Sequence, residues 1–130
     1  MTTPPEDRQA SAEAWLEYAE ADLDVARRSL QPLARLAPAC NLAQQSGEKA
    51  LKGYLVSLGP TRVPRTHDLE LLAERIVAAG GDAPDSEAAA VLTDYAVETR
   101  YPESPKPTAQ EAEHAPALAE RLLSFVRERI

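Results

Sequence analysis

Apolar and small residues recur at three- and four-residue steps through most of this chain, without strand-like alternation and without an internal repeat. This periodicity predicts five helical segments. The first covers residues 11–30, with Ser11 as N-cap and Pro32 beyond its end, and the second covers 38–58 and stops at Gly59. Their expected inward positions are Trp15, Leu16, Ala19, Leu23, Ala26 and Leu30, then Cys40, Ala43, Gly47, Ala50, Leu51, Tyr54, Leu55 and Leu58.

Three shorter segments follow. The third is expected to begin at Thr66 as N-cap and to end at Gly80, and the fourth to start near Asp85 or Ser86 and end before residue 102. The fifth opens with a capping-box pattern at 108–111, and Pro116 predicts a kink or a later start. Their expected inward positions are Leu69, Leu72, Ile76 and Ala79; Ala88, Val91, Leu92 and Tyr95; and Leu118, Leu122, Phe125 and Val126.

The connections between these segments are short and rich in proline, which favours antiparallel neighbours. We therefore predict an all-α protein, an antiparallel up-and-down bundle formed by one domain over residues 11–130 after a flexible stretch at 1–10. A length of 130 residues suits one domain, and the predominance of Ala and Leu with only 5% aromatic residues favours helix over sheet.

The cysteine count and the first residues of the chain exclude several classes of protein. Cys40 is the only cysteine, which excludes an intrachain disulfide and a cysteine-cluster metal site. The first residues lack the pattern of a signal peptide, and no apolar run approaches the ~20 residues that span a bilayer. We expect a cytoplasmic protein without membrane contact, metal or other cofactor.

The net charge of −7 hides an asymmetry. Between residues 25 and 67 seven basic residues accompany one acid, Glu48, so this middle part is about +6 and the rest about −13. Such a split can create an anion-attracting surface on an acidic protein. For Arg27 and Arg28, complementing the end of the first helix is an equally good explanation.

The second helix carries a polar strip, formed by Gln44, Glu48 and Lys52 at four-residue steps beside Lys49. One interpretation is a solvated face with a Glu48–Lys52 pair worth a few tenths of a kcal/mol. The other is a site, since Gly47 costs ~1 kcal/mol within a helix and usually marks a close approach.

Two further strings are candidate binding elements. Arg65, Thr66, His67 and Asp68 begin the third helix, where free N–H groups and a guanidinium could bind an anion, or where these residues could simply cap the helix. Arg100 and Tyr101 end the fourth helix, and Tyr101 could stack on a base or have no role beyond the helix end.

Four strings together give the chain a family resemblance. AxxDLxxAxxSL at 19–30, CNLAQQSGEKALKGYLVSLG at 40–59, THDL at 66–69 and YAVETRYP at 95–102 resemble the HEPN domain family, over about residues 11–129. The resemblance implies an antiparallel four-helix bundle with an additional short helix, commonly a homodimer. It also implies pairing with a minimal nucleotidyltransferase in modules like toxin–antitoxin systems.

Some members of that family are metal-independent ribonucleases that carry an Arg, four to six residues, then a His, whereas others bind nucleotides without cutting. Here the candidate catalytic residues are Arg100 and His67, but no His follows Arg100 at this spacing. Arg62 and His67 have the spacing but precede the third helix, away from the expected place. Thirteen residues separate Arg100 from His114.

Three hypotheses result. In the first, a non-catalytic protein binds a nucleotide or RNA phosphate, or a nucleotidyltransferase partner, through Lys49, Lys52, Arg65, His67, Arg100 and Tyr101. In the second, the chain is a ribonuclease toxin. In the third, it is a structural dimerisation module in which the charged residues of the second helix form ion pairs.

Overall fold

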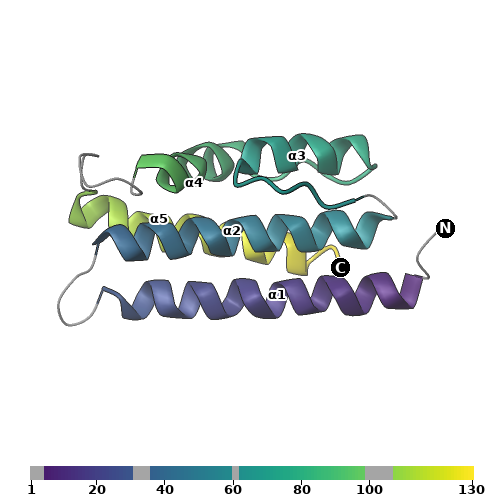
Figure 1. Cartoon of the computed structure of the whole chain (residues 1–130), viewed down its shortest axis with the longest axis horizontal. Helices are drawn as coiled ribbons and strands as arrows, with labels where there is room; N and C mark the ends of the chain where they lie inside the picture. The colour runs from purple at the N-terminus through teal and green to yellow at the C-terminus, as the bar shows by residue number, and fades with distance from the viewer. Residues whose placement is uncertain (1–4, 31–35, 60–61, 99–106) are drawn as a thin grey trace.

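The computed structural model is a bundle of α-helices and describes residues 5–30, 36–59, 62–98 and 107–130 (Figure 1). The helices are α1 (Pro5–Arg28), α2 (Leu36–Leu58), α3 (Leu69–Ala78), α4 (Ser86–Glu98) and α5 (Ala109–Arg127). No strand occurs within these ranges. The predicted all-α class is therefore confirmed.

The helices α1, α2, α4 and α5 form the up-and-down bundle, and α3 is the additional short helix (Figure 1). The C-terminal Arg27 of α1 pairs with Glu120 inside α5, and the C-terminal Arg127 of α5 pairs with Glu20 inside α1. This order of pairs shows that the two helices are antiparallel. The helix α2 contacts all four others. Between α2 and α3, residues 62–68 run back beside α2 (Figure 1).

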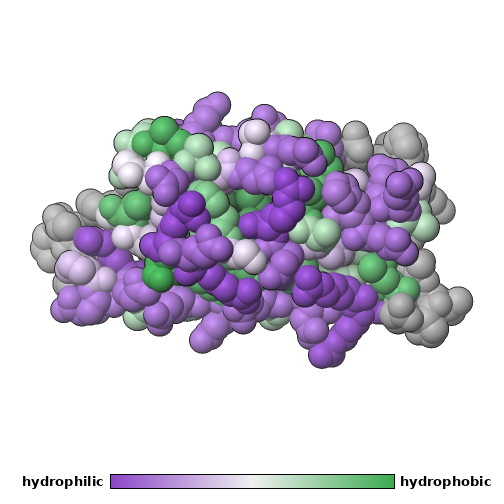
Figure 2. Space-filling model, turned by 180° about the vertical axis from the view of Figure 1, so that it is seen from behind, coloured by the Kyte–Doolittle hydropathy of each residue, from purple (hydrophilic) through white to green (hydrophobic). Residues whose placement is uncertain are grey.

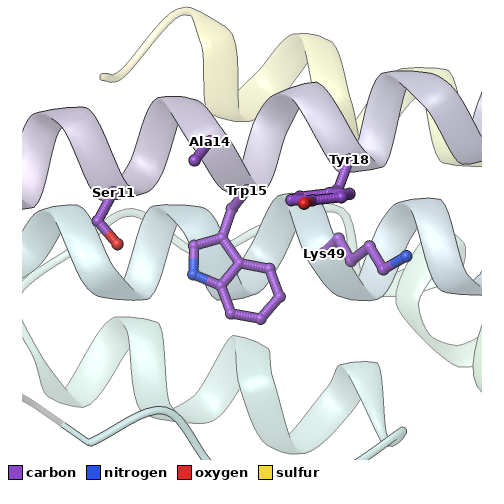
Figure 3. A pocket seen from close by; sticks show the side chains of 5 residues that line it. All are labelled: Ser11, Ala14, Trp15, Tyr18 and Lys49. Carbon is purple, nitrogen blue, oxygen red and sulfur yellow. The ribbon is translucent and has the colours of Figure 1, made fainter.

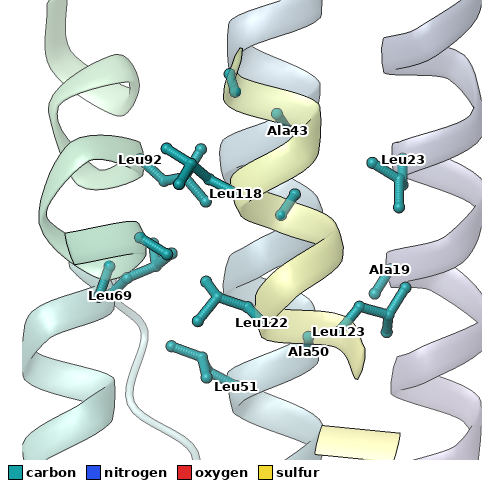
Figure 4. Close-up of a cluster of buried hydrophobic side chains, with 14 of the residues drawn as sticks. Ala19, Leu23, Ala43, Ala50, Leu51, Leu69, Leu92, Leu118, Leu122 and Leu123 are labelled. Atoms are coloured by element: carbon teal, nitrogen blue, oxygen red, sulfur yellow. The ribbon is translucent and has the colours of Figure 1, made fainter. Parts of the chain in front are cut away.

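The core is made of small and branched aliphatic side chains from all five helices (Figure 4). The predicted inward positions are buried or partly buried, with Trp15, Leu58 and Phe125 at the edge. Gly47 lies where three helices meet α2: a Cβ there would stand 3.0–3.1 Å from side-chain carbons of Leu69, Leu92 and Leu122. The close approach inferred from this glycine is confirmed.

Several helix boundaries differ from the prediction. The first helix begins at Pro5, so Ser11 lies inside it, because a proline at the first position and acidic residues in the first turn are start signals. Asp68 rather than Thr66 caps α3, since its carboxylate accepts the N–H groups of Glu70 and Leu71. Thr66 instead accepts the Asp68 N–H, at 3.1 Å.

The fifth helix has the predicted capping box at Thr108 and Glu111 and passes through Pro116. The alternative of a later start is wrong, because the capping box satisfies the first N–H groups and lets the helix begin at Ala109. Proline then removes only one helical hydrogen bond, and its buried ring packs in the core.

The opposite face of the molecule, shown in Figure 2, is mostly hydrophilic with scattered hydrophobic groups. The helix α5 lies on this side. Its arginines, and Arg129 just after its end, pair with acids of other segments: Arg121 with Asp85, Arg127 with Glu20, and Arg129 with Asp82. Within the described ranges, none of the helices is long and apolar enough to cross a membrane.

Candidate functional site

The polar strip of α2 lies inside the protein. Gln44, Glu48 and Lys52 are only 3%, 7% and 8% exposed. The interpretation as a solvated helix face is therefore wrong. These side chains are covered because residues 62–68 run back along α2 and place His67 directly over Glu48.

Glu48 is the centre of a hydrogen-bonded cluster. Its Oε1 accepts from Gln44 Nε2 at 3.1 Å and lies 2.8 Å from His67 Nδ1, and its Oε2 pairs with Lys52 Nζ at 2.8 Å. Burial alone would raise the pKa of Glu48, but the hydrogen bonds from Lys52, His67 and Gln44, with the charge of Lys52, lower it. The buried carboxylate is therefore ionised and has a cationic partner.

The same cluster fastens the connection between α2 and α3. Gln44 Nε2 also donates to the backbone carbonyl of His67, at 3.0 Å. An ionised carboxylate can only accept, so His67 Nδ1 carries a proton toward Glu48. The His67 side chain remains 60% exposed, and its Nε2 lies on the other side of the ring, available to a ligand.

Two arginines stand on this fastened segment. Arg62 and Arg65 are both exposed. Within the described residues, neither guanidinium forms an ion pair, whereas the five arginines 27, 28, 121, 127 and 129 each pair with a carboxylate. In the part of the chain that the structure describes, the segment therefore presents two guanidinium groups without ion-pair partners beside an exposed imidazole, with the Asp68 carboxylate at its end.

The start of α3 differs from the expected anion site. Asp68 Oδ1 accepts from Glu70 N at 2.9 Å and from Leu71 N at 3.2 Å, and Thr93 Oγ1 accepts from Leu69 N at 2.9 Å. The protein's own oxygens thus occupy the N–H groups that were predicted to bind an anion. That prediction is wrong, because the Asp68 side chain takes the ligand's place.

Lys49 lies away from this cluster and faces α1. Its Nζ pairs with Asp22 at 2.6 Å and stands 5.8 Å from the centre of the Tyr18 ring. One turn earlier, Ser46 donates to the carbonyl of Ala19 at 2.7 Å, so α2 is hydrogen-bonded to α1. The structure brings Lys52 and His67 together through Glu48 but leaves Lys49 at the α1–α2 groove.

The other candidates fall in two groups. Arg100 and Tyr101 lie outside the described residues, and His114 is exposed on α5. The four-residue spacing of Gln44, Glu48 and Lys52 is visible in the sequence, but it does not reveal that Gln44 and Glu48 hold residues 62–68 against α2. In the described part of the chain, no three His, Cys, Asp or Glu side chains gather closely enough to hold a metal ion.

Comparison with protein families identifies the family to which the chain belongs. A family model described as HEPN domain matches residues 12–129, nearly the whole chain. The chain belongs to the HEPN domain family. A structural relative of this HEPN protein is TT1696 from Thermus thermophilus, with 39% sequence identity and a TM-score of 0.75 over 92% of this chain and 98% of that one. Comparison with curated proteins finds no match.

The family assignment fits the placement of the HEPN strings in the fold. The string at 40–59 supplies the buried cluster of α2, and THDL at 66–69 supplies the histidine that it holds and the cap of α3. Two separate strings therefore form one hydrogen-bonded cluster, because residues 62–68 bring the second back onto the first.

Proposed function

We propose that this HEPN protein binds a phosphate group, of a nucleotide or an RNA, at residues 62–68 and does not cleave it. Arg65 and Arg62 supply guanidinium groups, which match phosphate oxygens with paired N–H donors. His67 adds a donor or acceptor at Nε2, on the exposed side of its ring. The acidic remainder of the chain limits indiscriminate RNA binding.

One observation carries this proposal: a buried ionised carboxylate, Glu48, holds an exposed histidine within a segment that bears two arginines without ion-pair partners among the described residues. Buried ion pairs are weak contributors to stability, because desolvation offsets their attraction. What this cluster provides is a fixed position for His67. A fixed cationic segment loses less conformational entropy when it binds an anion.

The two lysines receive a supporting role in this proposal. Lys52 is neutralised by Glu48 and Lys49 by Asp22, so either would have to break an ion pair to contact phosphate. We assign Lys52 to holding Glu48 in place rather than to direct contact. Arg100 and Tyr101 stay proposed contacts, with the Tyr101 ring as a stacking surface for a base.

The test is ligand-induced thermal stabilisation, measured with ATP, GTP, a short single-stranded RNA and inorganic phosphate. A ligand at 100 times its Kd should add ~2.7 kcal/mol to the free energy of unfolding. We expect Arg62→Ala/Arg65→Ala to abolish the shift and Arg75→Ala, a change of an exposed arginine on α3, to keep it. A flat response with every ligand would favour the purely structural module.

A second candidate, the ribonuclease, is favoured by the geometry of His67. In many enzymes a carboxylate that accepts from Nδ1 of a histidine orients the ring, so that the exposed Nε2 can act as a general base. Glu48 and His67 have this arrangement. Metal-independent ribonuclease activity is measured by incubating the protein with RNA in the presence of a chelator. Cleavage that disappears in His67→Ala or Arg100→Ala would establish the nuclease and overturn the non-catalytic proposal.

We also propose that the protein is a cytoplasmic homodimer that works with a minimal nucleotidyltransferase in a toxin–antitoxin-like module. Membership of the HEPN family supports this. The pairing predicts that a minimal nucleotidyltransferase is encoded beside this gene, and co-expression of the two proteins followed by affinity purification tests it. Recovery of the two proteins as separate species would refute it.

A further inference from the structure

The first helix carries apolar or small residues on two sides. The inner stripe is fully in the core: Ala12, Leu16, Ala19, Leu23 and Ala26. The outer stripe follows steps of three, four, three and four residues and is exposed along its whole length: Ser11, Ala14, Tyr18, Ala21 and Val25. The spacing of the outer stripe is that of a coiled-coil seam, where one helix packs on another.

Beside this stripe lies a cavity of about 360 Å³, lined by Ser11, Ala14, Trp15, Tyr18 and Lys49 (Figure 3). The four α1 residues stand at positions i, i+3, i+4 and i+7. Four residues at these positions form the hole that accepts one side chain of a facing helix. In Figure 3 the Trp15 and Tyr18 rings extend toward the same side, over α2.

We propose that the outer stripe is the surface on which a second copy of this chain packs, α1 against α1, antiparallel about a two-fold axis. Val25 of each copy enters the cavity beside Ala14 of the other. The inference rests on the homodimer proposed above and adds the surface and register. It is independent of phosphate binding, which uses the other side of α2.

Self-complementarity of shape favours this occupant. When Ala14 faces Val25 of the other copy, Tyr18 faces Ala21, so each large side chain of the stripe meets a small one. A parallel pair would bring Tyr18 against Tyr18 and leave small residues facing each other. Tyr18 and Val25 are 65% and 46% exposed, so this packing would remove apolar area from water.

The charges at the two ends of α1 favour the antiparallel direction. The first turn holds Glu6 and Asp7, and the last turn holds Arg27 and Arg28. Antiparallel packing aligns the helix dipoles favourably. In this register it places Arg28 opposite Ser11 of the other copy, about one helical turn from that copy's acidic first turn.

One pair of flanking positions opposes association in this register. Glu17 and Asp24 border the stripe on one side. In the proposed register, Glu17 of one copy lies near Asp24 of the other, and this happens twice because of the two-fold axis. Like charges at flanking positions weaken a helix pair. Glu17→Lys should therefore replace two repulsions by two attractions and lower the dimer dissociation constant several-fold.

Sedimentation equilibrium of the full chain tests the surface. We expect a dimer for the parent protein, a monomer for Val25→Glu, and a dimer for Val77→Glu, which changes a similarly exposed valine on α3 (51% exposed). Circular dichroism checks that each variant folds. A dimer that persists in Val25→Glu would overturn this surface and leave the homodimer standing, whereas a monomeric parent would overturn both.

Disulfide trapping tests the register. Ala14→Cys and Val25→Cys are prepared separately, oxidised alone and oxidised as an equal mixture. We expect a cross-linked dimer mainly in the mixture, because position 14 faces position 25. Equal cross-linking of either variant with itself would overturn the antiparallel register. The native Cys40 is buried and is present in every sample. Cross-linking of the parent protein therefore measures the background that comes from Cys40.

Discussion

At the scale of single residues, Glu48 has the most unusual environment in the described chain. Its carboxylate is inside a bundle of aliphatic side chains, and Lys52, His67 and Gln44 all direct polar atoms at it. Removal of one member of a buried pair leaves the other without compensation, which costs more than the pair contributes. The function of the cluster and the stability of the fold therefore depend on the same side chain.

We expect Glu48→Gln to lower the free energy of unfolding by roughly 2–3 kcal/mol at pH 7, because Lys52 loses its anionic partner in a buried site. The pKa of Glu48 is lowered from 4.5 in the folded protein, so its contribution is present above pH 4.5 and is lost as pH falls below that value. The difference between the two proteins should accordingly shrink at about pH 3.5.

Urea denaturation at about pH 7 and about pH 3.5 measures both quantities. The control is Glu113→Gln, which removes an exposed carboxylate of α5 and should leave stability within about 0.5 kcal/mol. A stability difference for Glu48→Gln that did not change between the two pH values would contradict the assigned ionisation.

At the scale of elements, Asp68 at the start of α3 has two opposing effects. Its side chain caps the helix, and its negative charge repels the phosphate that we propose as ligand. Asp68 fills the first N–H groups of the helix. It also places a carboxylate one residue from His67 and three from Arg65. The segment therefore gives up some anion affinity in exchange for a defined helix start.

Replacement of Asp68 separates these two effects. Asp68→Asn keeps an oxygen acceptor for the cap and removes the negative charge, so we expect phosphate or nucleotide affinity to rise about two- to fivefold, the effect of one surface charge. Asp68→Ala removes the cap too and should cost about 1 kcal/mol of stability. Isothermal titration calorimetry gives the affinity and thermal melting the stability.

An affinity that did not respond to Asp68→Asn, at low and at moderate salt, would place the ligand away from residues 62–68. The matched control is Glu113→Gln, which removes an exposed carboxylate of α5, a helix that does not contact α3. It should leave affinity unchanged, because only charges near the ligand act strongly at physiological ionic strength.

At the scale of the whole molecule, the bundle encloses its single thiol. Cys40 is 0% exposed, and burial, followed by the charge of Glu111, raises its pKa to about 11. At pH 8 only roughly one thiol in a thousand is then ionised, and thiolate is the reactive form. Labelling of Cys40 should therefore report opening of the bundle.

We expect iodoacetamide to leave the native protein unmodified at about pH 8 over an hour and to label it fully in urea, as measured by intact mass. With increasing urea, the labelling rate should follow the unfolding transition seen by circular dichroism. Rapid labelling without denaturant would show that the packing around Cys40 opens locally.

Much of this protein could be predicted from its sequence. Helical periodicity indicated the inward positions of all five helices, and Gly47 indicated a close approach that the contacts with Leu69, Leu92 and Leu122 confirm. Helix starts were less predictable. Thr66 and Asp68 both lie near the start of α3 and only Asp68 caps it, whereas α1 begins before the predicted Ser11.

The candidate site was predictable only in its components. Lys52, Arg65 and His67 were recognisable as charged or titratable residues, but periodicity cannot distinguish a polar strip that faces water from one that faces a returning segment. Residues 62–68 decide this, since contacts between residues 19 and 23 positions apart link His67 to Glu48 and Gln44.

By itself, the sequence determined an all-α bundle of the HEPN family. Helical periodicity and the family's short motifs can be recognised from neighbouring residues, so they do not require knowledge of which distant segments pack together. Only the tertiary structure decided that the polar strip of α2 is buried, that Lys49 and Lys52 are neutralised, and that Asp68 occupies the α3 N–H groups. The physical reason is that burial and charge compensation depend on which segments pack together, and local sequence does not specify that.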